Sequence, residues 1–262
     1  MLLVVDIGNT NIVCGVYNDR SLAAHWRLAT DVKKTSDEYG ILFASLLKDA
    51  ELPHRLSGAI ISSVVPALTG TFEDMLGQYF HQRPLVVTSD TDTGLTLRYP
   101  NPKEIGSDRL VNAAAAYHKY RRDLIVVDFG TATTFCAITA EGHYLGGVIA
   151  PGLGISAEAL FTRAAKLAKV ELIRPKTVIG SDTAGSIQAG LLFGYAGLVD
   201  TVVRRMEQEL GHSAYVIGTG GLSSILAAEA SSIQKVEPFL TLEGLELLYR
   251  RAQGSLPPTM QV

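Results

Sequence analysis

The sequence carries one short pattern twice, each time directly after a run of β-branched and leucine residues. Asp6-Ile7-Gly8-Asn9-Thr10 follows the run 2–5, and Asp128-Phe129-Gly130-Thr131-Ala132-Thr133-Thr134 follows the run 124–127. Each run is typical of a buried strand, so each Asp lies at a strand's end and the Gly permits a tight turn close to a phosphate. We call these segments the first and the second Asp-x-Gly turn. Their repetition predicts a duplicated nucleotide-binding fold.

The repeat continues beyond the two turns. Cys14 lies eight residues after Asp6, and Cys136 lies eight residues after Asp128, each in an expected second strand. Third strands are expected over 22–28 and 144–149, which gives two three-stranded meanders in register. The offset of 122 residues (128 minus 6) predicts two domains, 1–120 and 121–262.

The remaining pattern alternates between helices and strands. In the first half we expect a helix over 37–47 with Ser36 as its N-cap, a strand over 59–65, a helix over 66–80 and a strand over 84–88. A loop over 90–105 then leads to a helix over 107–120 that bridges the halves. In the second half we expect a helical stretch interrupted at Pro175, one or two helices over 183–210, a strand over 214–217, a helix over 222–230, a strand over 235–237, a helix over 242–252 and a frayed tail beyond 254.

Composition narrows the class of protein. The 262 residues are 47% hydrophobic and 19% charged, and no run approaches the roughly 18 apolar residues of a membrane helix. A net charge of −3 and a pI near 6.1 give no basic field for nucleic acid. Only two cysteines occur, and the chain opens on a strand rather than a signal peptide. We therefore expect a soluble cytoplasmic protein with no disulfide, no membrane partner and no nucleic-acid partner.

Further motifs carry a resemblance to a known family. With the later turn Gly218-Thr219-Gly220-Gly221, the two Asp-x-Gly turns resemble those of the acetate and sugar kinase, Hsp70 and actin superfamily, although the later turn could also be an ordinary strand-to-helix turn. More narrowly, the chain resembles type III pantothenate kinase in five motifs: Asp6-Ile7-Gly8-Asn9-Thr10-Asn11, Gly106-Ser107-Asp108-Arg109, Asp128-Phe129-Gly130-Thr131-Ala132-Thr133-Thr134, Gly146-Gly147-Val148-Ile149-Ala150-Pro151-Gly152 and Asp182-Thr183-Ala184-Gly185-Ser186. Ser107 stands where Ala is commoner in that family, and Cys136 where an acidic residue often stands.

The resemblance implies a fold and a reaction. The fold is α/β, a duplicated actin-like (ribonuclease H-like) ATPase fold of two β-β-β-α-β-α-β-α units with a cleft between them. The reaction is ATP-dependent phosphorylation of pantothenate to 4'-phosphopantothenate, the first step of coenzyme A biosynthesis, by a homodimer. The helical segment 183–210 is a candidate interface, with its apolar positions as intrachain core the alternative. Two other functions stay open: another small-molecule kinase of the superfamily, and a non-catalytic relative that acts in transcription.

Around the two turns, small residues let backbone N–H groups approach a phosphate. An ordinary hairpin turn, however, would contain the same residue types. Asp6 suits a magnesium ion that bridges the nucleotide phosphates. Near Asp128, three Thr hydroxyls could hold a phosphate or a cation, or could reflect only the strand propensity of Thr. The resemblance implies a monovalent cation, potassium or ammonium, at Asp128. It implies ATP contacts at Asp6, Ile7, Gly8, Asn9, Thr10, Asn11, Ile12, Val13 and Thr131.

Asp108 is the residue type that phosphoryl transfer to an alcohol requires. A carboxylate at the start of a helix can orient the hydroxyl and accept its proton, and Arg109 beside it can hold a substrate carboxylate by two parallel hydrogen bonds. The alternative is an Asp that stabilises a helix terminus. The resemblance also implies pantothenate contacts at Tyr99, Gly106, Ser107, Asp108, Arg109 and Thr183. For Tyr99 the alternative is an aromatic side chain packed within a loop.

Overall fold

The computed structural model describes residues 1–164, 167 and 169–254, and contacts divide the chain into two compact units. Unit 1 comprises Met1–Leu95, Pro100–Ala115 and the segment from Leu240 onward. Unit 2 comprises Thr96–Tyr99 and Ala116–Phe239. This grouping differs from the sequence-based halves 1–120 and 121–262, because the last helix packs on the strands of unit 1 and the short strand at 96–97 pairs with a strand of unit 2.

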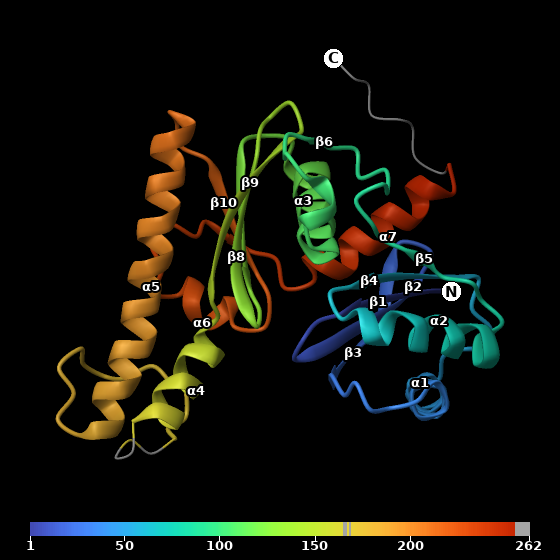
Figure 1. Ribbon diagram of the computed structural model, residues 1–262, viewed down its shortest axis with the longest axis horizontal. Coiled ribbons are helices and arrows are strands. Elements are labelled where there is room, and N and C mark those ends of the chain that lie inside the picture. The colour runs from blue at the N-terminus through green and yellow to red at the C-terminus, as the bar shows by residue number, and fades with distance from the viewer. Residues whose placement is uncertain (165–166, 168, 255–262) are drawn as a thin grey trace. The chain divides into compact units, whose positions relative to one another are not determined.

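Helices and strands alternate along the chain much as the sequence predicts (Figure 1). In order, the elements are β1 (Leu2–Ile7), β2 (Asn11–Asn18), β3 (Ser21–Ala29), α1 (Ser36–Asp49), β4 (Gly58–Ser63), α2 (Pro66–Phe80), β5 (Leu85–Val86), β6 (Thr96–Leu97), a 3-10 turn (Pro102–Glu104), α3 (Ser107–Tyr120), β7 (Leu124–Phe129), β8 (Ala132–Ile138), β9 (His143–Pro151), α4 (Leu153–Arg163), α5 (Thr183–Leu210), β10 (Tyr215–Thr219), α6 (Ser223–Ala227), β11 (Lys235–Val236) and α7 (Leu240–Ala252).

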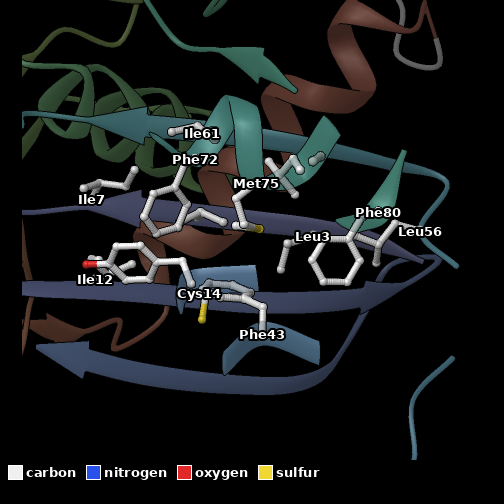
Figure 2. Close-up of a cluster of buried hydrophobic side chains, with 14 of the residues drawn as sticks. Leu3, Ile7, Ile12, Cys14, Phe43, Leu56, Ile61, Phe72, Met75 and Phe80 are labelled. Atoms are coloured by element: carbon white, nitrogen blue, oxygen red, sulfur yellow. The ribbon is translucent and has the colours of Figure 1, made fainter. Parts of the chain in front are cut away.

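Unit 1 is a five-stranded sheet in the order β3-β2-β1-β4-β5, in which β1 pairs antiparallel with β2 and parallel with β4. Successive side chains of a strand point to opposite faces, so β1 serves two cores. Leu3, Val5 and Ile7 meet apolar side chains of α1 and α2, and Figure 2 shows Phe43 and Phe72 in this cluster. The alternate residues of β1 face a second core, which includes side chains of α3 and α7.

Unit 2 is a six-stranded sheet in the order β11-β10-β7-β8-β9-β6. The odd-numbered residues of β7 pack against buried side chains of α5, among them Leu192, Tyr195 and Val199. By length and composition alone, α5 is the one helix of the described residues that could cross a membrane, a test that buried helices of soluble proteins also pass. The apolar positions of α5 that were considered for an interface are all buried or partly buried: Ile187, Leu191, Leu192, Tyr195, Leu198 and Val199. All but Ile187 belong to this core cluster or pack against it, which supports the alternative that they are intrachain core.

The two meanders are not in the same register. Asp6 pairs with Val13, seven positions later, whereas Asp128 pairs with Thr134, six positions later. A change of one residue moves a strand's side chains to the opposite face of the sheet. Cys14 therefore joins the core under α1 and α2, whereas the Cys136 thiol lies 3.5 Å from the Tyr144 hydroxyl. Both cysteines are buried and free, as predicted.

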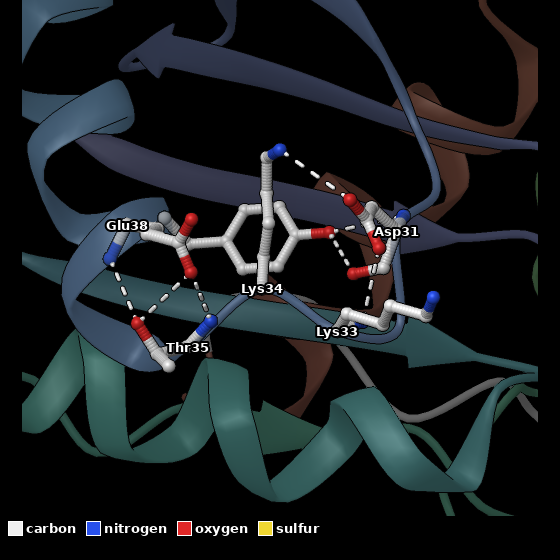
Figure 3. A network of polar contacts seen from close by, with 6 residues as sticks. Asp31, Lys33, Lys34, Thr35 and Glu38 are labelled. Atoms are coloured by element: carbon white, nitrogen blue, oxygen red, sulfur yellow. Dashed lines mark hydrogen bonds and ion pairs between the residues drawn. The ribbon is translucent and has the colours of Figure 1, made fainter.

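The first helix begins one residue earlier than predicted. Thr35, not Ser36, is the N-cap of α1, because Glu38 stands at the third helical position and completes a capping box (Figure 3). The Glu38 backbone N–H donates to Thr35 Oγ1 at 3.3 Å, and the Thr35 backbone N–H donates to Glu38 Oε2 at 2.8 Å. Lys34 and Asp31, 3.6 Å apart, form an ion pair next to the cap.

Two other segments differ from the sequence-based expectations. The expected loop 90–105 contains β6 and the 3-10 turn, since two residues suffice for β6 to pair with β9. The helical stretch expected up to Pro175 ends at Arg163, and no described residue of 164–182 is helical. The tail expected to fray lies beyond 254, outside the described residues.

Candidate active site

The first Asp-x-Gly turn closes tightly at the carboxyl end of β1. The Gly8 N–H donates to the Asn11 carbonyl at 3.0 Å, and a Cβ on Gly8 would lie 2.9 Å from that oxygen. Thr30, the residue after β3, donates from Oγ1 to the Gly8 carbonyl at 2.6 Å and fixes the turn. Asn9 and Thr10 are exposed, whereas Ile7 and Ile12 are fully buried. Ile7 and Ile12 can therefore offer a ligand only their backbone groups.

The start of α3 is tied to the end of β4. The Ser107 hydroxyl lies 3.0 Å from the Ser62 hydroxyl, accepts from the Ser63 N–H at 3.0 Å and donates to the Ser63 carbonyl at 3.1 Å. Ser62 is also the strand partner of Asp6 in the parallel β1–β4 pair. Unit 1 thus brings Asp6 and the 106–109 segment to the same end of its sheet.

Asp108 lies in this segment and is half-buried. Asp108 Oδ1 accepts from the Arg109 N–H at 2.7 Å, and a Cβ on Gly106 would lie 2.5 Å from the same oxygen, so the close approach requires Gly. Burial raises the pKa of Asp108, and the Arg109 N–H and charge only partly oppose it. A buried carboxyl group with a raised pKa is typical of catalytic acids and bases.

The second Asp-x-Gly turn has its own close contact in unit 2. Asp128 lies between Thr134 of β8 and Thr219 of β10 in the sheet. Gly220 follows β10 with a φ of +90°, and a Cβ there would lie 2.4 Å from Asp128 Oδ1. Gly220 is thus the residue that leaves room for the Asp128 carboxylate, a role that the sequence motif alone did not distinguish from an ordinary turn.

One of the three predicted Thr hydroxyls does not face a ligand. Thr133 is 1% exposed, and its Oγ1 lies 2.6 Å from the Tyr195 hydroxyl in the core of unit 2. Thr131 and Thr134 are partly exposed. Strand alternation explains the difference between Thr133 and Thr134, which point to opposite faces of β8, whereas Thr131 lies in the turn before β8. Sequence reasoning missed Tyr195; its signal was a Tyr in an apolar helical stripe, whose hydroxyl needs a buried partner.

Tyr99 and Thr183, the remaining predicted substrate contacts, both lie in unit 2. The Tyr99 ring meets the Tyr144 ring edge-on at 6.5 Å and crosses Gly146, where a Cβ would lie 3.3 Å from it. Tyr99 is half-buried, and its ring packs against β9 rather than within its own loop. Thr183 is exposed at the start of α5 and lines a cavity of about 800 Å³ between α4 and α5, after the N-cap Asp182.

The groups that could bind an ion at the two Asp-x-Gly turns are oxygen atoms of carboxylates, hydroxyls and backbone carbonyls. Among the described residues, no three His, Cys, Asp or Glu side chains gather to hold a metal ion. A single carboxylate at each turn suits an ion that takes its other oxygen ligands from phosphates, backbone and hydroxyl groups. The residues present at Asp6 and Asp128 therefore fit a nucleotide-bound magnesium ion and a monovalent cation better than a metal held by protein alone.

Comparison with known proteins identifies the family. The type III pantothenate kinase model matches residues 2–205. A protein of Geobacter sulfurreducens named type III pantothenate kinase is 53% identical over 252 residues, which cover 96% of this chain and 99% of that protein. This chain belongs to the type III pantothenate kinase family. It is therefore a kinase, and the family resemblance inferred from its five motifs is confirmed.

Solved structures confirm the fold class. A candidate 2-dehydro-3-deoxygalactonokinase of Sinorhizobium meliloti aligns with a TM-score of 0.54 and 13% identity over 96% of each chain. A Campylobacter jejuni protein, described as a conserved candidate transcriptional activator of the Baf family, aligns with a TM-score of 0.60 and 18% identity over 97% of this chain and 100% of that one. At these identities the likeness shows the fold alone, the α/β actin-like architecture shared with sugar kinases.

Proposed function

We propose that this kinase transfers the γ-phosphoryl group of ATP to the terminal hydroxyl of pantothenate, giving 4'-phosphopantothenate in the first step of coenzyme A biosynthesis. Membership of the pantothenate kinase family supports ATP and pantothenate as substrates and a divalent metal ion as cofactor. The observation that carries the proposal is the position of Asp108, which follows directly after Ser107, the residue bonded to Ser62 and Ser63 at the strand ends where Asp6 lies.

In unit 1 the residues divide the chemistry between binding and proton transfer. Asp108 orients the pantothenate hydroxyl and accepts its proton as the oxygen attacks the γ-phosphorus. Arg109 pairs with the pantothenate carboxylate. The backbone of residues 6–13 holds the ATP phosphates, and Asp6 holds the magnesium ion or its water ligands. Ser107 contributes its backbone only, because its hydroxyl is bonded to Ser62 and Ser63.

In unit 2 the assigned residues complete the substrate contacts. Asp128 would hold a monovalent cation, potassium or ammonium, which would supply positive charge to the nucleotide, and Thr131 would contact ATP. Tyr99 and Thr183 contact pantothenate. Two observations support this assignment: the Asp128 carboxylate fills the space left by Gly220, and Thr183 lines an open cavity.

We also propose a cytoplasmic homodimer without membrane or nucleic-acid partners. The exposed apolar side chains on β9, among them Val148 and Ile149, do not form one surface, because adjacent residues of a strand point to opposite faces of the sheet, so the proposed dimer rests on the family resemblance. Light scattering after gel filtration measures the mass directly. A monomer at micromolar concentration would contradict the proposed dimer without affecting the proposed reaction.

One assay tests the reaction. ADP release is coupled to NADH oxidation and measured with and without pantothenate, in the presence of magnesium and potassium. We expect ADP release to depend on pantothenate, with sugars, sugar acids and acetate as the comparison panel. Turnover with a member of that panel instead would favour another small-molecule kinase. No turnover with any acceptor, together with a DNA mobility shift, would favour the transcription-related alternative.

A further inference from the structure

Tyr195 of α5 is a buried polar anchor in the core of unit 2. Its side chain is 6% exposed, and its hydroxyl lies 2.6 Å from Thr133 Oγ1 and 2.7 Å from the Pro151 carbonyl oxygen. A phenol carries one proton and a carbonyl oxygen only accepts. With both bonds formed, Tyr195 therefore donates to Pro151, and the Thr133 hydroxyl donates to the phenol oxygen.

These two bonds join the start of β8, which follows the second Asp-x-Gly turn, to the end of β9. Thr133 follows the first residue of β8, and Pro151 is the last residue of β9. Directly after Pro151, the Gly152 N–H donates to the Thr131 carbonyl at 3.1 Å, and a Cβ on Gly152 would lie 2.3 Å from that oxygen. The backbone of the turn thus rests against a strand end that Tyr195 holds in place.

The residue after Thr133 is the strand partner of Asp128. Thr134 and Asp128 pair across the hairpin, so a shift of Thr133 along β8 also shifts the backbone opposite Asp128. The Tyr195 hydroxyl therefore restrains both sides of the turn. It restrains Thr131 through Pro151 and Gly152. It restrains Asp128 through Thr133 and Thr134. In a close-packed core, losing one such restraint changes geometry at neighbouring groups.

We propose that Tyr195 is a positioning residue of the kinase, whose hydroxyl sets the second Asp-x-Gly turn so that Asp128 can hold the cation and Thr131 can contact ATP. The inference rests on the roles proposed above for Asp128 and Thr131. Tyr195 itself is enclosed in the core and acts through Thr133 and Pro151.

The test replaces the hydroxyl and keeps the ring. In Tyr195→Phe, the Pro151 carbonyl and the Thr133 hydroxyl lose their partner. We expect the KM for ATP and the half-saturating potassium concentration to rise roughly three- to tenfold, a part of what the loss of the two buried hydrogen bonds costs. The KM for pantothenate should change less than twofold.

Tyr117→Phe is the matched control in the same unit. Tyr117 is 8% exposed, and its hydroxyl donates to the Ala140 carbonyl at 3.3 Å, away from the turn. We expect Tyr117→Phe to lower the Tm while leaving the ATP and potassium constants at wild-type values. If Tyr195→Phe behaves in the same way, its hydroxyl has only a structural role and the inference is overturned.

Thr133→Val provides an independent variant from the other side of the bond. It removes the hydroxyl that donates to Tyr195 at nearly constant volume, and it should raise the same two constants. The double variant Tyr195→Phe/Thr133→Val should differ little from the more affected single variant, because the two hydroxyls share one interaction. Fully additive effects would contradict the proposed connection.

A binding measurement separates this inference from the proposed function. Titration calorimetry with a non-hydrolysable ATP analogue, in potassium and in sodium, needs no acceptor and no turnover. Tyr195→Phe should bind the analogue more weakly than wild type, with a smaller difference between the two cations. A wild-type protein that binds the analogue but does not phosphorylate pantothenate would overturn the proposed function and leave this result readable. Unchanged analogue binding in Tyr195→Phe would overturn the positioning role alone.

Discussion

The Ser107 hydroxyl lies 3.0 Å from the Ser62 hydroxyl and joins the first turn of α3 to the end of β4. Ser62 is fully buried and is the strand partner of Asp6. The proposed base is the next residue, Asp108, so its position is set by the same strand ends that carry the first Asp-x-Gly turn. This short connection brings two candidate residues about a hundred positions apart in sequence to the same strand ends.

Asp108→Asn should lower kcat by about 10²-fold or more while ATP binding is retained, since a general base contributes roughly that factor. Stopped-time assays and calorimetry with an ATP analogue measure the two quantities. Asp37→Asn is the matched control, because Asp37 also lies in the first turn of a unit 1 helix. Turnover of Asp108→Asn at the level of Asp37→Asn would exclude the base role.

The raised pKa of Asp108 gives a pH dependence with a definite sign. A carboxylate acts as a base when it is ionised, so kcat/KM for pantothenate should rise as pH rises through the pKa of Asp108. Burial places that pKa above the ordinary Asp value of about 3.9. Because the folded-state pKa is raised, ionisation of Asp108 costs stability as pH rises through that pKa. Asp108→Asn should therefore have an equal or higher Tm at pH 7. A clearly lower Tm would contradict the burial effect.

Arg109→Lys should raise the KM for pantothenate more than the KM for ATP, because Lys cannot make the two parallel hydrogen bonds that Arg makes to a carboxylate. Arg109 is 7% exposed, so the Tm is measured alongside the steady-state constants. Pantothenol, which lacks the carboxylate, is the control substrate and should lose little between wild type and variant. An equal rise for ATP and pantothenate would indicate that Arg109 serves the nucleotide.

Wild-type activity should require potassium or ammonium and be poorly supported by sodium or lithium. The smaller radii of sodium and lithium would leave the Asp128 carboxylate and the other oxygen ligands too far from the ion. The cations are titrated at fixed magnesium-ATP and constant ionic strength. In Asp128→Asn the preference for potassium should be lost. Equal rates in all four cations for the wild type would remove Asp128 as a cation ligand.

Gly220→Ala should impair cation-dependent activity more than the backbone strain alone explains. Gly220 and Gly211 both have positive φ, +90° and +80°, so an Ala at either costs about 1–2 kcal/mol. A Cβ at 220 also meets Asp128 Oδ1 at 2.4 Å and the Phe129 backbone N and C at 2.8 Å, next to Asp128, whereas one at 211 meets nothing within 4 Å. Both variants should lose Tm, and only Gly220→Ala should need more potassium. The same potassium requirement in both would show that the contact has no effect on Asp128.

Thr35→Ala should lower the free energy of unfolding by about 1 kcal/mol, since it removes the N-cap of α1, whereas Ser36→Ala should change it little. Chemical denaturation measures both values, and neither change should affect kcat. A larger loss for Ser36→Ala would return the cap to the residue that the sequence favoured.

The order of elements could be predicted from the sequence because hydrophobic periodicity and turn residues act locally. The strands at 2–7 and 124–129, the helix starting at Pro66 and the helix over 107–120 follow from such patterns. The N-cap of α1 and the end of α4 were misplaced for the same reason, since two adjacent hydroxyl residues, or an apolar stretch without a clear stop, satisfy a local pattern equally well. Family membership followed from five motifs in order, and comparison confirmed it.

The amino-acid sequence by itself determined the repeated strand-and-turn pattern, the family and the identity of the candidate residues, since these depend on residue types at fixed spacings. Only the tertiary structure decided which of those residues are buried in the core and which stay accessible to solvent. Because the second turn is shorter by one residue, Cys136 lies on the other face of its sheet. Strand alternation points Thr133 into the core, where its hydroxyl bonds to Tyr195. The bond between Ser62 and Ser107 sets the position of Asp108. Each outcome depends on contacts between residues distant along the chain, and no local pattern encodes the distance between them.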